Sequence, residues 1–373
     1  MKLRYKIASG ILIVLALAIS ALAVILSHDS ACAPAPAVSE GAELMKAVVY
    51  RCYGSSDVLA LENIEKPTPA DNEVLVKVQA AAVNPLDWHY MRGSPYFMRL
   101  GSGLGTPKDT RLGVDFTGTV EAVGSMVTRF KPGDEVFGGR TGAFGEYVVV
   151  AEDRALALKP SNVTFEQAAS APIAALTALQ ALRDKGELQP GQKVLINGAS
   201  GGVGTFAVQI AKSLGAEVTG VCSTRNVEMV RSIGADHVFD YTNEDYTESG
   251  QTYDLIIDMV GNHSLSANRQ VLKPEGKFVI IGGAKGNWLG PLMGPLKAAL
   301  LSPFVDQEFG MMLARMDKED LVFLGELMQS GKVTPVIDRR YRLDEVPAAI
   351  EYSEEGHARG KIIINLEMRD REY

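Results

Sequence analysis

A glycine cluster between an apolar strand pattern and an apolar helix pattern constrains this chain more than any other feature. The run Val194–Ile196 is typical of a buried strand, and the stretch GASGGVG at 198–204 follows it directly. Apolar residues then recur at helical spacing from Val203 to Leu214. A strand, a glycine turn and a helix in this order present free backbone N–H groups to a pyrophosphate. We therefore expect a dinucleotide site formed by Ala199, Ser200, Gly201, Gly202, Val203 and Gly204.

The end of the next predicted strand indicates which nicotinamide is bound. An NAD site usually has Asp or Glu about 20 residues past the glycines, where the carboxylate binds the ribose 2′-hydroxyl. This chain instead has Ser223, Thr224 and Arg225 after the strand run at 216–222. Hydroxyls and a guanidinium suit a 2′-phosphate, and the missing carboxylate removes a repulsion, so NADPH is favoured over NADH. The alternative makes Arg225 a solvated residue at the start of a helix.

Tyr241 follows the third strand run, HVFDY. Its ring is a candidate for closing the adenine side of the dinucleotide, and the alternative is a place in the core. The carboxyl ends of the fourth and fifth strand runs should line the nicotinamide end, because ligands of such sheets bind there. These ends supply Val260, Gly261, Ile281 and Gly282.

Composition limits the classes of function. A chain of 373 residues has room for two domains. The net charge is −8 and no basic block occurs outside the first six residues, so nucleic-acid binding is not expected. The three cysteines, Cys32, Cys52 and Cys222, are far apart and form no CxxC pair. They predict neither a structural zinc cluster nor a disulfide framework.

The first 44 residues differ from the rest. Residues 7–26 carry no charge and follow Lys2, Arg4 and Lys6. A helix over them would span about 30 Å, so we expect one N-terminal transmembrane anchor, with its basic flank in the cytoplasm and a linker up to residue 44. Two alternatives remain: a cleaved signal segment with an exported body, or a true start at Met45 that leaves a cytoplasmic protein. The anchored topology conflicts with the scarcity of NADPH outside the cell.

The body divides by pattern into a β-rich part and an α/β part. Short strand runs with Gly/Pro turns at 45–160 predict a compact β-rich domain. Residues 164–186 predict a helix, and five strand runs alternating with helices up to residue 283 predict a doubly wound parallel sheet. The apolar stretch 286–305, which includes Trp288, Leu289 and Leu292, predicts a flexible cover over a bulky substrate. A dimer contact and a packed loop are the alternatives. Two helices and a closing strand, KIIINL, should follow.

This order of parts resembles the medium-chain dehydrogenases/reductases. Gly191-Gln192, Leu195, the run 199–202, Gly204, Gln209 and Lys212 resemble the signature of the quinone oxidoreductase (zeta-crystallin-like) branch. Further matching segments occur at 84–88, 113–124, 130–138, 171–182 and near the C-terminus, so the resemblance covers most of residues 45–373. It implies a GroES-like catalytic domain at 45–165, an NADP-binding Rossmann domain at 166–315 and a C-terminal return to the catalytic domain at 316–373. We also expect a homodimer.

The resemblance raises the question of a catalytic metal. Zinc-dependent members of the family have Cys-Gly-x-Asp where this chain has Asn84–Asp87, and a His-Glu pair where it has Val114-Asp115. Valine cannot ligate a metal, so a zinc with three protein ligands cannot be assembled. The four close cysteines of the structural-zinc lobe are also missing. We therefore expect an enzyme without a metal site.

Without a Lewis acid, hydride transfer to a conjugated acceptor is favoured, because the developing charge delocalises into an enolate or hydroquinone. The sequence thus predicts an NADPH-dependent oxidoreductase of quinones or α,β-unsaturated carbonyls. An alcohol or aldehyde reductase and an NADPH-binding scaffold protein with little turnover are the alternatives.

The resemblance also indicates the residues of the reaction site. Asn84, from the family's NPxD motif, should contact the nicotinamide ribose or the substrate oxygen, with a capping role as the alternative. Tyr90 is a candidate hydrogen-bond or proton donor, or else pocket wall, and Asp87 should organise the loop. Thr177 should meet the nicotinamide or a phosphate.

Overall fold

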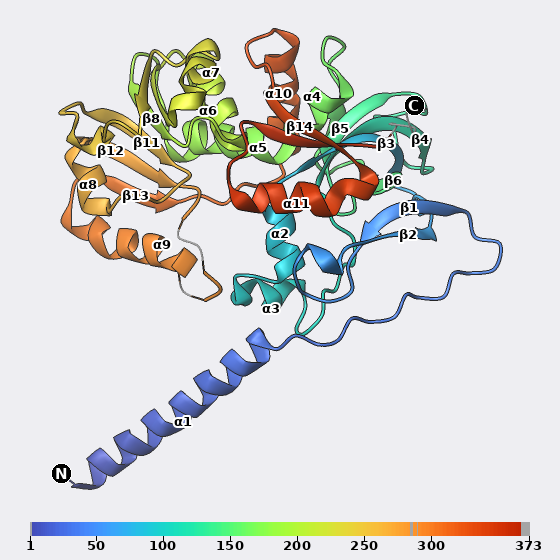
Figure 1. Cartoon of the computed structure of the whole chain (residues 1–373), viewed down its shortest axis with the longest axis horizontal. Helices are drawn as coiled ribbons and strands as arrows, with labels where there is room; N and C mark the ends of the chain where they lie inside the picture. Colours follow the sequence, from blue (N-terminus) through green and yellow to red (C-terminus); the bar gives the residue numbers. More distant parts are fainter. Residues whose placement is uncertain (1, 284–285, 289, 367–373) are drawn as a thin grey trace.

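The computed structural model describes residues 2–283, 286–288 and 290–366. Within these residues a parallel sheet and a larger, mostly antiparallel sheet lie side by side, with helices between them and around the parallel sheet (Figure 1). Helix α5 (Pro172–Gln180) packs against α6 (Gly202–Ser213) on one side and against the second sheet on the other. Helix α10 (Lys318–Gln329) packs beside α5. The predicted α/β architecture with a β-rich partner is thus confirmed.

The parallel sheet has the order β10-β9-β8-β11-β12-β13 in the described chain. Its strands are β8 (Lys193–Asn197), β9 (Glu217–Cys222), β10 (His237–Asp240), β11 (Tyr253–Asp258), β12 (Leu272–Ile280) and β13 (Glu308–Met311). Five of them coincide with the predicted runs, whereas the short edge strand β13 was not predicted. The core on one face includes α5, α6 and α7 (Val227–Ser232), and the core on the other includes α8 (Leu265–Gln270) and α9 (Gly290–Leu301). The sheet is therefore doubly wound.

The second sheet has the order β14-β15-β3-β4-β5-β7 among the described residues, with β6 also paired to β3. Its strands are β3 (Glu73–Val83), β4 (Asp115–Val123), β5 (Glu135–Gly139), β6 (Tyr147–Ala151), β7 (Leu156–Leu158), β14 (Ile337–Arg342) and β15 (Lys361–Asn365). A separate hairpin joins β1 (Leu44–Val49) to β2 (Ala60–Glu65). The closing strand β15 pairs antiparallel with β3 and so belongs to the β-rich sheet.

Two helical segments differ from expectation. The helix predicted over 164–186 is divided into α4 (Phe165–Ala169), α5 and a π-turn at Ala181–Lys185. Pro172 begins α5, because proline lacks an N–H and is favoured in the first turn of a helix rather than inside one. The predicted cover at 286–305 contains α9, and Leu289 lies outside the described residues.

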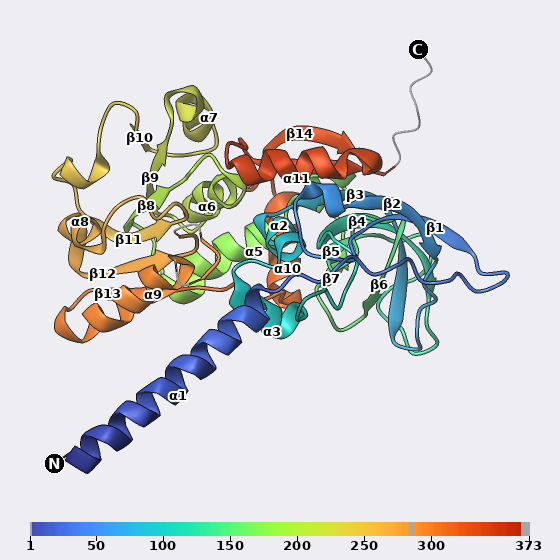
Figure 2. The same ribbon diagram turned by 60° about the horizontal axis from the view of Figure 1, so that its bottom comes forward.

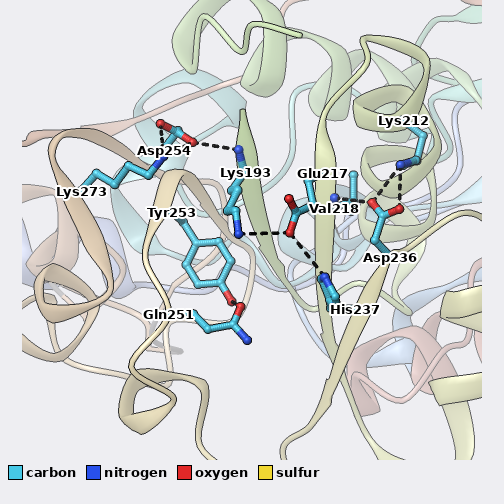
Figure 3. A network of polar contacts seen from close by, with 10 residues as sticks. All are labelled: Lys193, Lys212, Glu217, Val218, Asp236, His237, Gln251, Tyr253, Asp254 and Lys273. Atoms are coloured by element: carbon cyan, nitrogen blue, oxygen red, sulfur yellow. Dashed lines mark hydrogen bonds and ion pairs between the residues drawn. The ribbon is translucent and has the colours of Figure 1, made fainter. Parts of the chain in front are cut away.

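Ion pairs connect the amino ends of the parallel strands (Figure 3). Glu217 at the start of β9 pairs with Lys193 of β8 at 3.3 Å and with His237 of β10 at 3.4 Å. Asp236 accepts from the Val218 N–H and pairs with Lys212 of α6, both at 2.8 Å. These contacts lie at the edge opposite the carboxyl ends of the strands, so Lys212 has a structural role.

The N-terminal segment contacts the body. Helix α1 (Lys2–Ser27) projects from the body, and its last turn meets the region of α3 (Arg99–Ser102) (Figures 1 and 2). In the part of the chain that the structure describes, no helix is both long and apolar enough to cross a membrane, so the predicted transmembrane anchor is not supported. A disulfide joins Cys32 to Cys52, contrary to the prediction from cysteine spacing. The linker folds back and brings the two Cα atoms within 4.5 Å.

Candidate active site

The glycine turn lies between β8 and α6, as predicted. Gly198 has a φ of +94°, a conformation that favours glycine, and the Ala199 N–H donates to the Val221 carbonyl oxygen at 3.0 Å. A Cβ atom on Gly204 would lie only 2.1 Å from the Gly198 oxygen. The strand end and the helix start are therefore so close that only glycine fits at position 204. Gly201 forms the N-cap of α6, and the first amide groups of a helix lack partners within it and suit an anion.

A polar cluster lies where β9 ends. The Asn226 side-chain nitrogen donates to the hydroxyls of Ser200 and Ser223, each at 3.1 Å, and so connects the glycine turn to the segment after β9. Asn226 is buried, and its Oδ1 atom has no hydrogen-bond partner in the described structure. An orphaned acceptor beside a glycine turn fits a ligand hydroxyl or a bridging water.

Arg225 is exposed and faces a second arginine that the sequence reasoning did not identify. The Arg225 Nη2 atom donates to the His357 carbonyl oxygen at 3.1 Å, and the Arg359 Nη2 atom donates to the Arg225 carbonyl oxygen at 3.2 Å. Two arginines 134 residues apart in the sequence thus meet beside the segment that follows β9. Thr224 is exposed in the same segment and hydrogen-bonds Thr242. Tyr241 is 60% exposed, so the alternative of a core position is wrong.

Asp258 organises the expected nicotinamide end. Its Oδ1 atom accepts from the N–H groups of Val260 at 3.0 Å and Gly261 at 2.9 Å, and from the Asn197 amide at 2.9 Å. A Cβ on Gly282 would lie 2.1 Å from the Met259 carbonyl oxygen, and the Ile281 N–H donates to the backbone carbonyl oxygen of Asp258 at 2.9 Å. The ends of β8, β11 and β12 therefore meet closely here. Asp258, which the sequence reasoning did not single out, connects them.

Asn84 occupies a buried junction between distant segments. Its Oδ1 atom accepts from the Lys361 ammonium at 2.6 Å, and its Nδ2 atom donates to Asp115 Oδ2 at 3.0 Å. Asp115 Oδ1 accepts from the Ile173 N–H, at the start of α5, at 3.0 Å. The side chains of Asn84, Asp115 and Lys361 are nearly fully buried. The junction thus joins the end of β3, β4, α5 and β15.

Asp87 lies beside this junction at the first turn of α2 (Pro85–Arg92). It accepts from the Asn84 N–H at 2.7 Å, which fits the loop-organising role expected for it. Burial raises the pKa of Asp87 to about 7. Burial also raises the pKa of Asp115 and lowers the pKa of Lys361, while the Lys361–Asp115 attraction opposes both changes.

The remaining predicted residues are less exposed to a ligand than expected. Tyr90 is half-buried and packs against the core of the β-rich part. Thr177 is 7% exposed, and its hydroxyl donates to the Ile173 carbonyl oxygen at 2.7 Å. Both roles therefore stay predictions.

The junction already contains a cation. Lys361 Nζ lies 3.6 Å from Asp115 Oδ2 and 2.6 Å from Asn84 Oδ1, and these two positions resemble ligand positions of the zinc-dependent enzymes. A second cation beside this ammonium would be repelled. Among the residues that the structure describes, no group of three or more His, Cys, Asp and Glu side chains is arranged to hold a metal ion.

Comparisons with known proteins agree with this architecture. Residues 70–160 match the alcohol dehydrogenase GroES-like domain and residues 233–364 the zinc-binding dehydrogenase domain. A 2-methylene-furan-3-one reductase of Solanum lycopersicum is 35% identical over 342 residues, covering 86% of this chain and 79% of the relative. The quinone oxidoreductase of Coxiella burnetii superposes with a TM-score of 0.77 at 30% identity, covering 87% of this chain and all of that one. The Escherichia coli quinone oxidoreductase complexed with NADPH superposes with a TM-score of 0.74 at 25% identity, covering 86% of this chain and 100% of that one. The chain belongs to the zinc-independent, quinone oxidoreductase-like branch of the medium-chain dehydrogenases/reductases.

Proposed function

We propose that this protein is an NADPH-dependent oxidoreductase that transfers hydride to a quinone or an α,β-unsaturated carbonyl without a catalytic zinc. One arrangement carries the proposal: a dinucleotide turn stands beside a junction in which Asn84 and Val114 replace metal ligands and Lys361 supplies the positive charge. The acceptor class follows from the names of the tomato reductase and the two bacterial oxidoreductases, which reduce related conjugated compounds.

The residues present fit NADPH. The close approach of Gly204 to Gly198 leaves the start of α6 open to a pyrophosphate, and Asn226 has an unused buried acceptor beside it. Arg225 and Arg359 supply two cations for a 2′-phosphate, with the hydroxyls of Ser223 and Thr224 nearby. When bound, NADPH supplies the hydride. No acidic residue at 223–226 would repel the 2′-phosphate.

The chain's own contribution is to hold and enclose the reactants. Asp258 fixes the backbone of Val260 and Gly261 at the nicotinamide end, and the Lys361 junction fixes the Asn84 corner opposite. Half-exposed apolar side chains on the segments that follow α2 and β12, Phe97 and Trp288, offer a surface for a planar, conjugated acceptor. Since they carry no charge, they also favour exclusion of water.

The test is steady-state NADPH oxidation by the full-length protein with a panel of benzoquinones, enones and saturated aldehydes. We expect turnover with quinones or enones, little with saturated aldehydes, and rates unchanged after EDTA treatment. Faster reduction of saturated aldehydes would favour the alcohol or aldehyde reductase. Tight NADPH binding without turnover of any acceptor would favour the scaffold protein. Loss of activity with EDTA that zinc restores would contradict the metal-free assignment.

Dimerisation is part of the same proposal. Its support is the family assignment, and sedimentation of the purified protein at micromolar concentration measures it directly.

A further inference from the structure

Arg99, at the start of α3, is a charged side chain with only 1% exposure. Its Nη1 atom donates to the carbonyl oxygens of Leu26 and His28, each at 3.1 Å. Its Nη2 atom pairs with the Asp29 carboxylate at 2.8 Å. The guanidinium is therefore covered by the last turn of α1 and the residues that follow it. A buried arginine of this kind needs all these acceptors, since an unpaired buried charge is costly.

The other side of the same guanidinium contacts the loop that follows α2. Arg99 Nε donates to the Gly93 carbonyl oxygen at 2.7 Å, and Nη2 donates to the Arg92 carbonyl oxygen at 3.2 Å. The guanidinium carbon also lies 4.3 Å from the Tyr53 ring centre and 4.7 Å from the Tyr96 ring centre. Arg99 thus connects the N-terminal segment to the backbone of this loop and to the Tyr96 ring, and it also contacts Tyr53 from the segment after β1.

Two further contacts secure the N-terminal segment. The Ser30 N–H donates to the Gly105 carbonyl oxygen at 3.0 Å, and the Cys32–Cys52 disulfide follows two residues later. We call residues 26–32 the N-terminal strap and residues 93–105 the entrance loop. The strap therefore holds both ends of the entrance loop, at Gly93 through Arg99 and at Gly105 directly.

The entrance loop in turn contacts the segment after β12. The Ser94 hydroxyl donates to Asn287 Oδ1 at 2.7 Å, and the Tyr96 N–H donates to the Asn287 carbonyl oxygen at 2.7 Å. The rings of Tyr96 and Trp288 meet edge to face with centres 4.8 Å apart. This contact joins the β-rich part to the α/β part.

That contact lies between the two segments that flank hydride transfer. The entrance loop continues from α2, which begins next to Asn84, while Asn287 and Trp288 follow Ile281 and Gly282 at the carboxyl end of β12. Ligands of such sheets bind at this end. Phe97 of the entrance loop and Trp288 next to Asn287 are 40% and 43% exposed, so both apolar rings reach the solvent.

We propose that Arg99 is a positioning residue for the acceptor substrate, and that the N-terminal strap is a working part of the substrate entrance. The strap holds the entrance loop so that Tyr96 and Trp288 form one aromatic wall for a planar quinone or enone. This inference rests on the proposed function for the identity of the substrate. It also makes residues 26–32 necessary for full activity, which disfavours a functional protein that starts at Met45.

The test uses full-length protein with Ser30→Pro, which removes the N–H that bonds Gly105. Ala35→Pro, at an exposed position of the linker, is the matched control. Hydrogen exchange measures the entrance loop independently of turnover. We expect the Tyr96 amide to exchange at least about tenfold faster in Ser30→Pro and at the wild-type rate in the control. An unchanged exchange rate of the Tyr96 amide in Ser30→Pro would overturn the proposal that the N-terminal strap holds the entrance loop.

Kinetics then separate positioning from plain stability. For Ser30→Pro we expect KM for the acceptor to rise about 5- to 20-fold, while kcat and the NADPH dissociation constant stay within about twofold. Arg99→Lys keeps the charge but loses the forked geometry of the guanidinium. It should likewise raise the acceptor KM while kcat and the NADPH dissociation constant stay nearly unchanged. A lowered melting temperature with unchanged acceptor KM in both variants would overturn the proposal. If the wild type reduces no acceptor, the proposed function fails, whereas the exchange experiment still decides whether the strap holds the loop.

Discussion

The Nζ atom of Lys361 lies 2.6 Å from the Oδ1 atom of Asn84, although 277 residues separate them. An amide side chain can reverse its oxygen and nitrogen at little cost in shape. Lysine is only a donor, so it requires the Asn84 oxygen and turns the Asn84 nitrogen toward Asp115. The last strand of the chain thereby fixes the orientation of the candidate catalytic amide.

Lys361→Met leaves Asp115 without its buried cation. We expect a loss of about 3–5 kcal/mol in the free energy of unfolding, because one partner of a buried pair remains charged. Adding Asp115→Asn should restore most of this loss, since both charges are then removed. Urea denaturation measures both variants.

Arg340→Gln is the control for this experiment, because Arg340 forms an exposed ion pair with Glu166. This substitution should lower the free energy of unfolding by less than about 1 kcal/mol. Wild-type stability in Lys361→Met, or a double variant less stable than Lys361→Met, would contradict the assigned role of the pair.

The sequence predicted local features well and long-range pairs poorly. The glycine turn at 198–204 and the strands around it follow from spacing within about 20 residues, which is visible in one sequence. Lys361 and Arg359 carried no such signal, because their partners lie far along the chain. The same holds for the contact between Asp258 and Asn197, which are 61 residues apart. A buried lysine within the apolar run GKIIINL was the available clue. The Cys32–Cys52 disulfide was missed for a related reason, since an Ala/Pro-rich linker gives no indication of where it folds back.

Preference for NADPH should depend on both arginines at the 2′-phosphate corner. Arg225→Ala and Arg359→Ala should each weaken NADPH binding about 10- to 100-fold and change NADH binding less than about threefold, because each guanidinium contributes one charge-assisted interaction. Fluorescence titration with both nucleotides measures the ratio of the NADH dissociation constant to the NADPH dissociation constant. Arg340→Ala is the surface control and should leave the ratio unchanged. Equal losses for NADPH and NADH would place the arginines away from the 2′-phosphate.

The glycine turn offers a pair of matched substitutions. In Gly204→Ala the new Cβ would lie 2.1 Å from the Gly198 oxygen, whereas in Gly201→Ala the nearest atom would be 3.5 Å away. We expect Gly204→Ala to lower the free energy of unfolding by about 2–4 kcal/mol, and Gly201→Ala by less than about 1 kcal/mol. Both are measured without nucleotide, so the comparison reports the turn itself. Similar stabilities would mean that the backbone relaxes at position 204.

Asp87 should make stability fall as the pH rises. Its pKa is about 7 in the folded protein and 3.8 as the ordinary value, so between these pH values the folded state binds the extra proton. The stabilising effect is complete below pH 3.8 and is lost as the pH rises through about 7. Asp87→Asn keeps a neutral acceptor for the Asn84 N–H and removes the titration. As the pH rises from about 4 to about 7.5, the free energy of unfolding of this variant should increase by a few kcal/mol relative to that of the wild type. Urea denaturation at each pH measures the difference.

Asp57→Asn, at an exposed position, is the control for the same pH series. Its difference from the wild type in free energy of unfolding should stay constant across the range. The decisive comparison is at pH 7.5, where the Asp87 carboxylate is charged, buried and close to Asp115. If Asp87→Asn is less stable than the wild type there, Lys361 compensates the Asp87 charge fully, and the junction stabilises two carboxylates rather than one.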